Sequence, residues 1–344
     1  MKRRHPATCL HLLTTAFVLT SCQGSDPGPD APTDIPGDLP TDIPTDIPTD
    51  IPTDIPTDVP TDVPTDVPTD VPIATGCNGA EALCSKRFNE VAYPTTHNAM
   101  SNEDEGWIAP NQPHGIERQL EDGVRGMMLD LHYGDGDGET TDLATVYLCH
   151  SECILGNRPL LDALVAIKAF LDAHPRDVLT LIFESYVSGG DVAAAFEAAG
   201  LLPYLHAQDV NQPWPALGAM GDTGRRLVVF TNRDAGAAPW YHDQWAYTFE
   251  NPWSAKTRTD LSCDVDRGQP TNSLYTLNHF AANPFPDPEE AALTNQNPFF
   301  VDQAQKCWNE RNHIPNFPTV DFYDLGDLFA VVRTLNGLDA PPPP

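Results

Sequence analysis

Apolar runs and amphipathic segments alternate along most of the chain. Residues 124–131 and 178–183 are almost continuously apolar, a pattern typical of strands that are buried on both faces. Residues 159–174 place apolar side chains at helical spacing behind a proline, which predicts a helix. A second helix is expected at residues 191–199, because a glycine follows it. Further strands are predicted at residues 226–231, 273–278 and 319–323.

Repeated strand–helix units in one segment of this size are typical of a barrel of parallel strands covered by helices. Residues 76–338 show no break in composition, so we expect them to form one domain. We therefore predict an α/β fold, a distorted (β/α)8 TIM barrel. A doubly wound parallel sheet is the alternative, although no glycine-rich phosphate loop follows the first strand.

Residues 1–21 have the organisation of an export signal. Lys2, Arg3 and Arg4 precede an apolar stretch that is too short to span a bilayer stably. The stretch ends in Leu-Thr-Ser-Cys at Cys22, which resembles a bacterial lipobox. That resemblance implies cleavage before Cys22 and attachment of lipid to it. An ordinary cleaved signal with an incidental cysteine is the alternative.

Residues 22–75 are expected to be a disordered, extended tether. From Thr41 the unit Thr-Asp-Ile/Val-Pro is repeated eight times. Proline at every fourth position removes backbone donors and fixes φ, so neither helix nor sheet can form. We interpret the segment as a spacer that holds the following domain away from the anchoring surface. The chain ends in a run of prolines, and residues 339–344 are expected to be a disordered tail.

The formal net charge of the chain is −30 at pH 7, and the segment after the tether is also acidic. Nucleic-acid binding requires a basic face, so we exclude that class of partner. Strong electrostatic docking on anionic lipid is excluded for the same reason. We expect a monomer.

Six cysteines remain in the domain once the signal is removed and Cys22 carries lipid. An even number of cysteines in an exported domain predicts disulfide bonds. A Cys-His-Cys metal site around His150 is the alternative, but no second matching knuckle is present. Sequence proximity favours the pairs Cys77–Cys84, Cys149–Cys153 and Cys263–Cys307.

Five polar residues lie at the ends of apolar runs or just beyond them. They are His97 and Asn98 in PTTHNAM, Asp130 in GVRGMMLDLHYGDGD, His150 in LCHSEC, and Glu184 in VLTLIFES. Barrel enzymes place catalysis at the C-terminal ends of their strands, so we expect these side chains to meet there. Two histidines suit acid–base work on a phosphodiester, and an amide with two carboxylates suits a hard divalent cation.

The alternation of side chains along the predicted strands supports this convergence. Asp130 and His132 share a face with Met128, whereas Arg125 points the other way. Glu184 lies on the corresponding face of the next strand, so Asp130 and Glu184 can converge inside the barrel mouth.

The candidates for substrate binding include two residues of the last predicted strand. Asp321 and Tyr323 share a face late in that strand, where they either line the mouth of the barrel or fill its interior. The full set of candidate substrate-binding residues is Arg125, His132, Asp321 and Tyr323.

The order of these motifs resembles the phosphatidylinositol-specific phospholipase C X-domain family, whose members have a distorted TIM barrel. The similarity covers residues 89–185, with a Thr-His-Asn turn, a Gly-Val-Arg…Leu-Asp strand, a Cys-His loop and a strand that ends in glutamate. The segment PNFPTVDFYDLGD near the C-terminus also resembles bacterial members.

The resemblance implies a role for each of the five residues. His97 is the general base and His150 the general acid. Asn98, Asp130 and Glu184 match positions that bind Ca²⁺ in the metal-dependent branch of the family. The metal-independent bacterial branch has an arginine where this chain has Asp130, which favours Ca²⁺ as a cofactor.

The chain departs from the metal-dependent pattern at one position. Two residues before Asp130, where those enzymes carry a further glutamate ligand, this chain has Met128. No residues match the basic groups that bind ring phosphates in the eukaryotic enzymes, so an unphosphorylated headgroup is expected.

The expected function is cleavage of a phosphatidylinositol-like lipid or glycolipid into a cyclic phosphate headgroup and diacylglycerol. The protein is expected to be an exported lipoprotein, anchored through its N-terminal lipid at the bacterial outer membrane or cell surface. The alternative is a catalytically inactive binding module on the same barrel; both histidines favour the enzyme and Met128 favours the module. The related glycerophosphodiester phosphodiesterases need a His-Arg pair near the first strand, which Thr-His-Asn does not fit.

Overall fold

The computed structural model of the protein describes residues 76–134 and 146–339. The expected export signal, the lipidation site at Cys22 and the tether lie outside the described residues. The same holds for the expected C-terminal tail, apart from Asp339.

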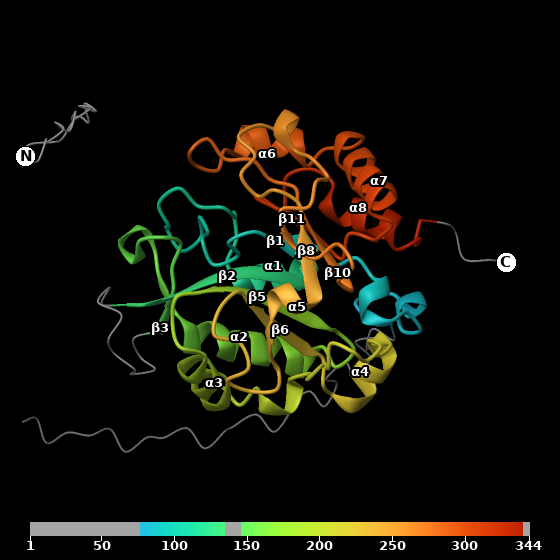
Figure 1. Ribbon diagram of the computed structural model, residues 1–344. Helices are drawn as coiled ribbons and strands as arrows, with labels where there is room; N and C mark the ends of the chain where they lie inside the picture. Colours follow the sequence, from blue (N-terminus) through green and yellow to red (C-terminus); the bar gives the residue numbers. More distant parts are fainter. Residues whose placement is uncertain (1–75, 135–145, 340–344) are drawn as a thin grey trace, which may run out of the picture. The chain divides into compact units, whose positions relative to one another are not determined.

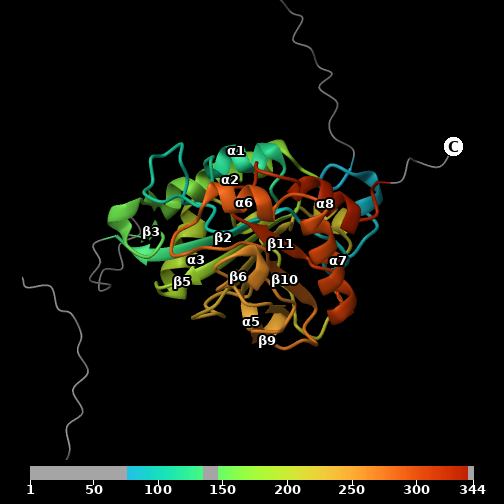
Figure 2. The same cartoon turned by 90° about the horizontal axis from the view of Figure 1, so that it is seen from above.

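Eight parallel strands lie side by side in chain order and curl into a barrel-like sheet (Figures 1 and 2). They are β1 (Thr95–Thr96), β2 (Gly126–Tyr133), β5 (Leu179–Ser185), β6 (Leu227–Thr231), β7 (Tyr241–Asp243), β8 (Thr248–Glu250), β10 (Leu274–Asn278) and β11 (Phe317–Val320). β1 pairs with both β2 and β11, so the first and last strands of the domain are neighbours. No ladder pair joins β7 to β8 within the described residues, and the barrel is open at this seam. The predicted distorted (β/α)8 barrel is confirmed.

Two short antiparallel arms extend the sheet at the C-terminal ends of the parallel strands. β3 (Val146–Leu148) pairs with the end of β2 and with β4 (Arg158–Pro159). β9 (Arg267–Gly268) pairs with the end of β8. Both arms therefore lie on the side of the barrel where the candidate residues were expected.

Helices cover the outside of the barrel (Figure 1). The longest is α2 (Leu160–Ala173), which starts directly after Pro159 as predicted and buries apolar side chains at helical spacing. The other α-helices are α1 (Ile116–Asp122), α3 (Gly189–Ala198), α4 (Leu217–Thr223), α5 (Gln244–Tyr247), α6 (Pro288–Thr294), α7 (Phe299–Arg311) and α8 (Leu328–Leu335). The 3₁₀ helices are η1 (Glu81–Leu83), η2 (Phe88–Glu90), η4 (Cys153–Leu155), η5 (Leu202–Tyr204) and η6 (Arg258–Asp260).

The core has two parts, because alternate strand residues face opposite sides of the sheet. Ile182 and Phe230 belong to the cluster that also contains Met128. Leu181 and Val229, their neighbours along the same strands, pack in the other cluster with α2 and α3. The inner face of β2 and β5 is thus the face that carries Asp130 and Glu184, as the alternation predicted.

The last strand differs from its prediction. It was expected at residues 319–323, but β11 begins at Phe317 and ends at Val320. Pro318 lies inside the strand. Proline cannot donate to a ladder, so its presence favoured a strand that begins after it. Phe322 has a left-handed φ of 46°, so Asp321 and Tyr323 do not share a strand face.

Three disulfides join neighbouring cysteines, and all three predicted pairings are confirmed. They are Cys77–Cys84, Cys149–Cys153 and Cys263–Cys307. In the part of the chain that the structure describes, every helix is too short or too polar to cross a membrane.

Candidate active site

The five candidate residues lie around one pocket at the C-terminal ends of the strands. The pocket has a volume of about 640 Å³. His97 and Asn98 follow β1, and His150 follows β3. Asp130 and Glu184 line the same pocket from the ends of β2 and β5. Strands that are neighbours in the barrel therefore bring together residues that are far apart in the sequence.

Asp130 and Glu184 are register partners in the parallel pair of β2 and β5. Both side chains project from the same face of the sheet. Burial raises the pKa of Asp130 well above its usual range, and the negative charge of Glu184 raises it further. Tyr186 donates its hydroxyl to Glu184, and this bond is the main cause that raises the pKa of Tyr186 to about 12. Two carboxyl groups thus share one wall of the pocket, and Glu184 disfavours the charged form of Asp130.

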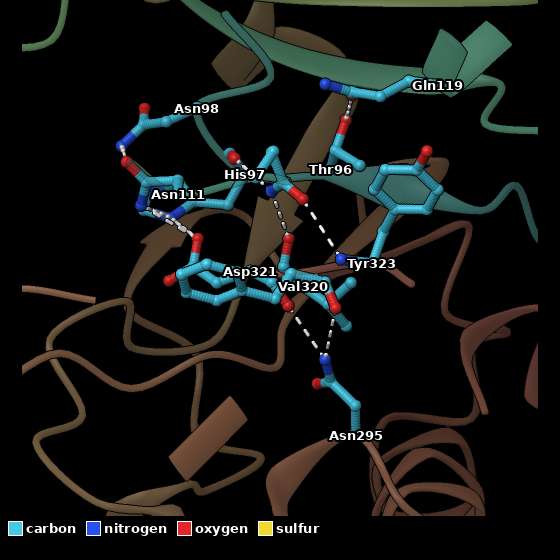
Figure 3. A network of polar contacts seen from close by, with 11 residues as sticks. Thr96, His97, Asn98, Asn111, Gln119, Asn295, Val320, Asp321 and Tyr323 are labelled. Atoms are coloured by element: carbon cyan, nitrogen blue, oxygen red, sulfur yellow. Dashed lines mark hydrogen bonds and ion pairs between the residues drawn. The ribbon is translucent and has the colours of Figure 1, made fainter. Parts of the chain in front are cut away.

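His97 is oriented by a buried carboxylate. Its Nδ1 lies 2.9 Å from Oδ1 of Asp321, which follows β11 (Figure 3). The same oxygen accepts a hydrogen bond of 2.9 Å from Nδ2 of Asn111. Because a carboxylate only accepts, Nδ1 of His97 carries a proton, and in the neutral ring the lone pair is then on Nε2. The imidazole also stacks on Phe280, with 3.8 Å between the ring centroids.

The turn after β1 is joined to β11 through its backbone. The amide N–H of His97 donates to the carbonyl of Val320 at 2.9 Å. The side chain of Gln112 donates to the carbonyls of both residues, which fixes the turn further. Asn98 adopts a left-handed φ of 44°, and its Nδ2 lies 3.4 Å from Oδ1 of Asn111.

His150 lies in the loop that the Cys149–Cys153 disulfide closes. The backbone N–H of Cys149 donates to the carbonyl of Asp130 at 3.2 Å, which joins this loop to β2. Burial lowers the pKa of His150, and the positive charge that His97 can carry lowers it further. Two rings coupled in this way favour states in which only one of them is protonated.

The two histidine-bearing loops also contact each other. The backbone N–H of Ile108, in the loop after His97, donates to the carbonyl of Leu155 at 2.7 Å. Trp107 packs against Gly156 so closely that a Cβ there would lie 2.3 Å from the indole. These contacts hold the loop of His150 against the loop of His97.

His132 lines the pocket beside the carboxylates. Its ring stacks on Tyr186, with 4.5 Å between the ring centroids. Burial lowers the pKa of His132, and its buried Nε2 has no hydrogen-bond partner among the described residues. Met128 lines the same pocket from the face that it shares with Asp130.

Comparison with known proteins assigns the chain to a family. The sequence model of the PI-PLC X domain (PI-PLC X 1) matches residues 83–336. The chain belongs to the PI-PLC X domain family.

Two fungal relatives and one solved bacterial structure are similar to this chain. The chain is 30% identical to the PI-PLC X domain-containing protein 1 of Arthroderma benhamiae over 287 residues, which is 76% of this chain and 90% of that protein. It is 27% identical to an uncharacterized secreted protein of the same fungus, of which it spans 64%. The phosphatidylinositol-specific phospholipase C of Listeria monocytogenes matches with a TM-score of 0.50 at 13% identity, over 75% of this chain and 96% of that one. This structural likeness confirms the TIM-barrel fold of the family.

Three of the four residues expected to contact substrate do not line the PI-PLC X pocket, and these expectations are corrected. Arg125 precedes β2, at the opposite end of the strand from the pocket, and pairs with Asp177 at 2.7 Å. Tyr323 donates its hydroxyl to Asp122 at 2.6 Å. Asp321 contacts His97 behind the pocket wall. Only His132 has the expected position.

The sequence did not reveal the wall of the pocket that lies on β8 and β9. Glu250, at the end of β8, is buried and forms an ion pair with Arg267 of β9. The guanidinium of Arg267 lies 4.8 Å from the ring centroid of Trp245. Burial raises the pKa of Glu250, and Arg267 opposes this effect. β8 and β9 are too short to give a periodic pattern. Glu250, Asn251 and Trp253 in TFENPWS resemble a pocket-lining loop, although an ordinary loop is the safer interpretation, and the structure places Glu250 and Trp253 in the pocket lining.

Apolar side chains gather at the mouth of the pocket. Four exposed large hydrophobic residues line it, with exposed fractions of 44% to 61%. They are Ile108, Tyr186, Trp253 and Phe285. We refer to these four residues as the apolar rim.

Proposed function

We propose that this chain cleaves the phosphodiester of a phosphatidylinositol-like lipid by acid–base catalysis with two histidines. The observation that carries the proposal is that His97 and His150 line one pocket, with His97 held by the buried Asp321. The products are a cyclic phosphate headgroup and diacylglycerol.

The chemistry follows from the protonation states of the two rings. Nε2 of His97 accepts the proton of a headgroup hydroxyl next to the phosphodiester, and that oxygen attacks phosphorus. Asp321 stabilises the imidazolium that forms, because it accepts the hydrogen bond from Nδ1. His150 donates a proton to the lipid oxygen as its bond to phosphorus breaks. Because its pKa is lowered, His150 is a stronger acid than an ordinary histidine.

The donor set at the carboxylate wall fits a calcium ion. Asn98, Asp130 and Glu184 line one pocket, and each carries side-chain oxygen, the ligand that Ca²⁺ prefers. Burial and the negative charge of Glu184 both raise the pKa of Asp130, and a bound cation would oppose both effects. We propose that these three residues hold Ca²⁺. A bound cation would stabilise the negative charge that develops on the phosphate.

The position of the apolar rim supports a lipid surface as the partner. The rim residues are exposed and line the pocket that a headgroup would enter, so the same face would meet the membrane. A chain with a net charge of −30 gains little from anionic lipid, and apolar contact would dominate binding. The secreted relative supports export, and we propose that lipid on Cys22 anchors the exported chain to the bacterial surface.

One observation favours a second candidate function, an inactive binding module on the same barrel. Met128 stands at the fourth ligand position of the family and lines the pocket with a thioether, which is a poor ligand for calcium.

The test is the release of water-soluble phosphate ester from phosphatidylinositol vesicles. The full chain would be assayed with calcium, with a chelator, and as the variant His97→Ala. We expect release that requires both calcium and His97. Release in chelator would remove the metal from the mechanism. Vesicle binding without release under either condition would support the binding module.

A further inference from the structure

We propose that Asn111 is a positioning residue that orients the side-chain amide of Asn98, so that its oxygen faces the pocket. The inference rests on the proposed function, because that orientation matters only if Asn98 binds a cation. Asn111 lies in the loop between β1 and α1, is 1% exposed and does not itself follow a strand.

The orientation of Asn111 is set by Asp321. The Asn111 side chain reaches Oδ1 of Asp321 at 2.9 Å. A carboxylate has no proton to donate, so the atom of Asn111 that faces it must be the NH₂ group. The carboxylate itself is buried and is held in place by His97 at 2.9 Å (Figure 3).

The orientation of Asn98 then follows from that of Asn111. Because the NH₂ group of Asn111 faces Asp321, its Oδ1 faces the other way, toward Asn98 at 3.4 Å. An oxygen needs a donor, so Asn98 presents its own NH₂ group in return. This leaves Oδ1 of Asn98 without a hydrogen bond to any of the described residues. Asp321 thus orients the amide of Asn111, and Asn111 orients the amide of Asn98.

Asn98 lies close to the two carboxylates, so the orientation of its amide decides whether it can bind the same cation. The backbone N–H of Ala99 donates to the carbonyl of Met128 at 2.9 Å, which holds the Asn98 turn beside β2. A cation between Asp130 and Glu184 would require oxygen from this amide, and an NH₂ group there would repel it. Asp321 would therefore influence cation binding without being a ligand.

The backbone of Asn111 makes its side chain suitable for a clean test. Its N–H donates to the carbonyl of Ser101 at 3.0 Å, and its carbonyl accepts from the N–H of Phe322 at 2.8 Å. Both bonds remain in Asn111→Ala, which removes only the amide link. Asn102→Ala is the matched control, because Asn102 is also buried in this loop but, among the described residues, its side chain bonds only to backbone groups of Met100 and Glu105.

The experiment measures calcium affinity by calorimetry on the full chain, without lipid. We expect Asn111→Ala and Asp321→Asn each to weaken calcium binding by about 10-fold or more, because each removes a residue that helps to orient a metal ligand. The double variant should be no weaker than the weaker single variant, because both changes break one chain of contacts. In an Asn98→Asp background, Asn111→Ala should have almost no effect, because either carboxylate oxygen can serve as ligand. Asn102→Ala should bind calcium like the wild type.

The outcomes separate this inference from the proposed function. Unchanged calcium affinity in Asn111→Ala, or an equal loss in the Asn98→Asp background, would overturn the role of Asn111. Failure of the wild-type chain to bind calcium would overturn it as well, whereas lipid cleavage in chelator would leave the two-histidine mechanism standing. Calcium binding with the expected pattern but without lipid cleavage would retain the inference and reject the proposed function.

Discussion

Asp130 and Glu184 are register partners on neighbouring parallel strands, and the negative charge of Glu184 helps to raise the pKa of Asp130. The two carboxylates repel each other across the pocket wall. The repulsion destabilises the fold unless a proton or a cation offsets it. The stability of the protein therefore depends on what occupies this wall.

The first prediction concerns metal removal. Calcium at about 100 times its dissociation constant should raise the free energy of unfolding by about 2.7 kcal/mol, and chelator should abolish the gain. Asp130→Asn should increase stability in chelator, because it removes the repulsion, and should lose the calcium-dependent gain. Thermal unfolding with and without calcium measures both effects. Glu197→Gln, at an exposed position on α3, is the control; the same response there would contradict the prediction.

The second prediction separates Asp321 from Tyr323. Asp321→Asn should lower kcat by roughly 100-fold or more, because His97 loses the carboxylate that fixes its tautomer. Tyr323→Phe removes a hydroxyl that bonds Asp122 outside the pocket, so kcat should stay near wild type while stability falls. Steady-state kinetics and urea unfolding on both variants test this. Equal losses of kcat would show that both residues act through the fold.

The third prediction concerns the loop that carries His150. Replacing Cys149 and Cys153 together by alanine should lower activity strongly but stability only modestly, because the disulfide closes a loop with a sequence separation of only 4. The Cys77–Cys84 disulfide is the matched control, since none of the residues that it encloses lines the pocket, whereas His150 and Ser151 do. Its removal should lower the melting temperature and leave kcat near wild type. The opposite pattern would mean that the disulfide does not position His150.

The fourth prediction concerns the apolar rim. Trp253→Ala and Phe285→Ser should weaken binding to neutral vesicles by about 10-fold each, because each loses a large apolar contact with lipid. Activity on a soluble short-chain substrate should change little. Val165→Ser, which alters an exposed apolar residue on α2, is the control. Vesicle sedimentation at low and high salt measures binding, and a steep salt dependence would argue against apolar docking.

The fifth prediction concerns acid stability. Burial lowers the pKa of His279 to about 4, and the same cause lowers the pKa of His242 to about 4. Their ordinary pKa in the unfolded chain is about 6.5, so the unfolded chain binds more protons between these values. Stability should be complete above pH 6.5 and should fall between pH 6.5 and pH 4, by an amount on the order of 3 kcal/mol for each histidine.

The variant His279→Gln tests this assignment, because glutamine keeps a donor for the carbonyl of Thr294 but does not titrate in this range. Between pH 4 and pH 6.5, the slope of the unfolding free energy against pH should decrease by an amount that corresponds to about one fewer proton bound on unfolding. An unchanged slope would show that other groups govern acid unfolding.

The sequence predicted the elements whose patterns are long. β5 and α2 have enough consecutive buried or periodic positions to be placed within one or two residues of their bounds. β1, β7 and β8 contain only two or three residues each, and no pattern can mark a strand of that length. The barrel was therefore predicted as a fold class, whereas its open seam between β7 and β8 was not.

The candidate site divides in the same way. His97, Asp130 and Glu184 end apolar runs, so the sequence indicated that they would meet. Asn111 has no such pattern around it, because it lies in an irregular loop and its side chain bonds to Asp321, 210 positions away in the sequence. The partner of a buried amide depends on chain segments that only the folded barrel brings together.

The pairing of the first strand with the last has a consequence for biosynthesis. His97 follows β1 and its carboxylate partner follows β11, at a sequence separation of 224. A chain that is still being made or exported cannot form this pair until its final strand has docked beside its first. The carboxylate that orients His97 is thus among the last parts of the domain to be made, so the oriented histidine forms only when the barrel is almost complete.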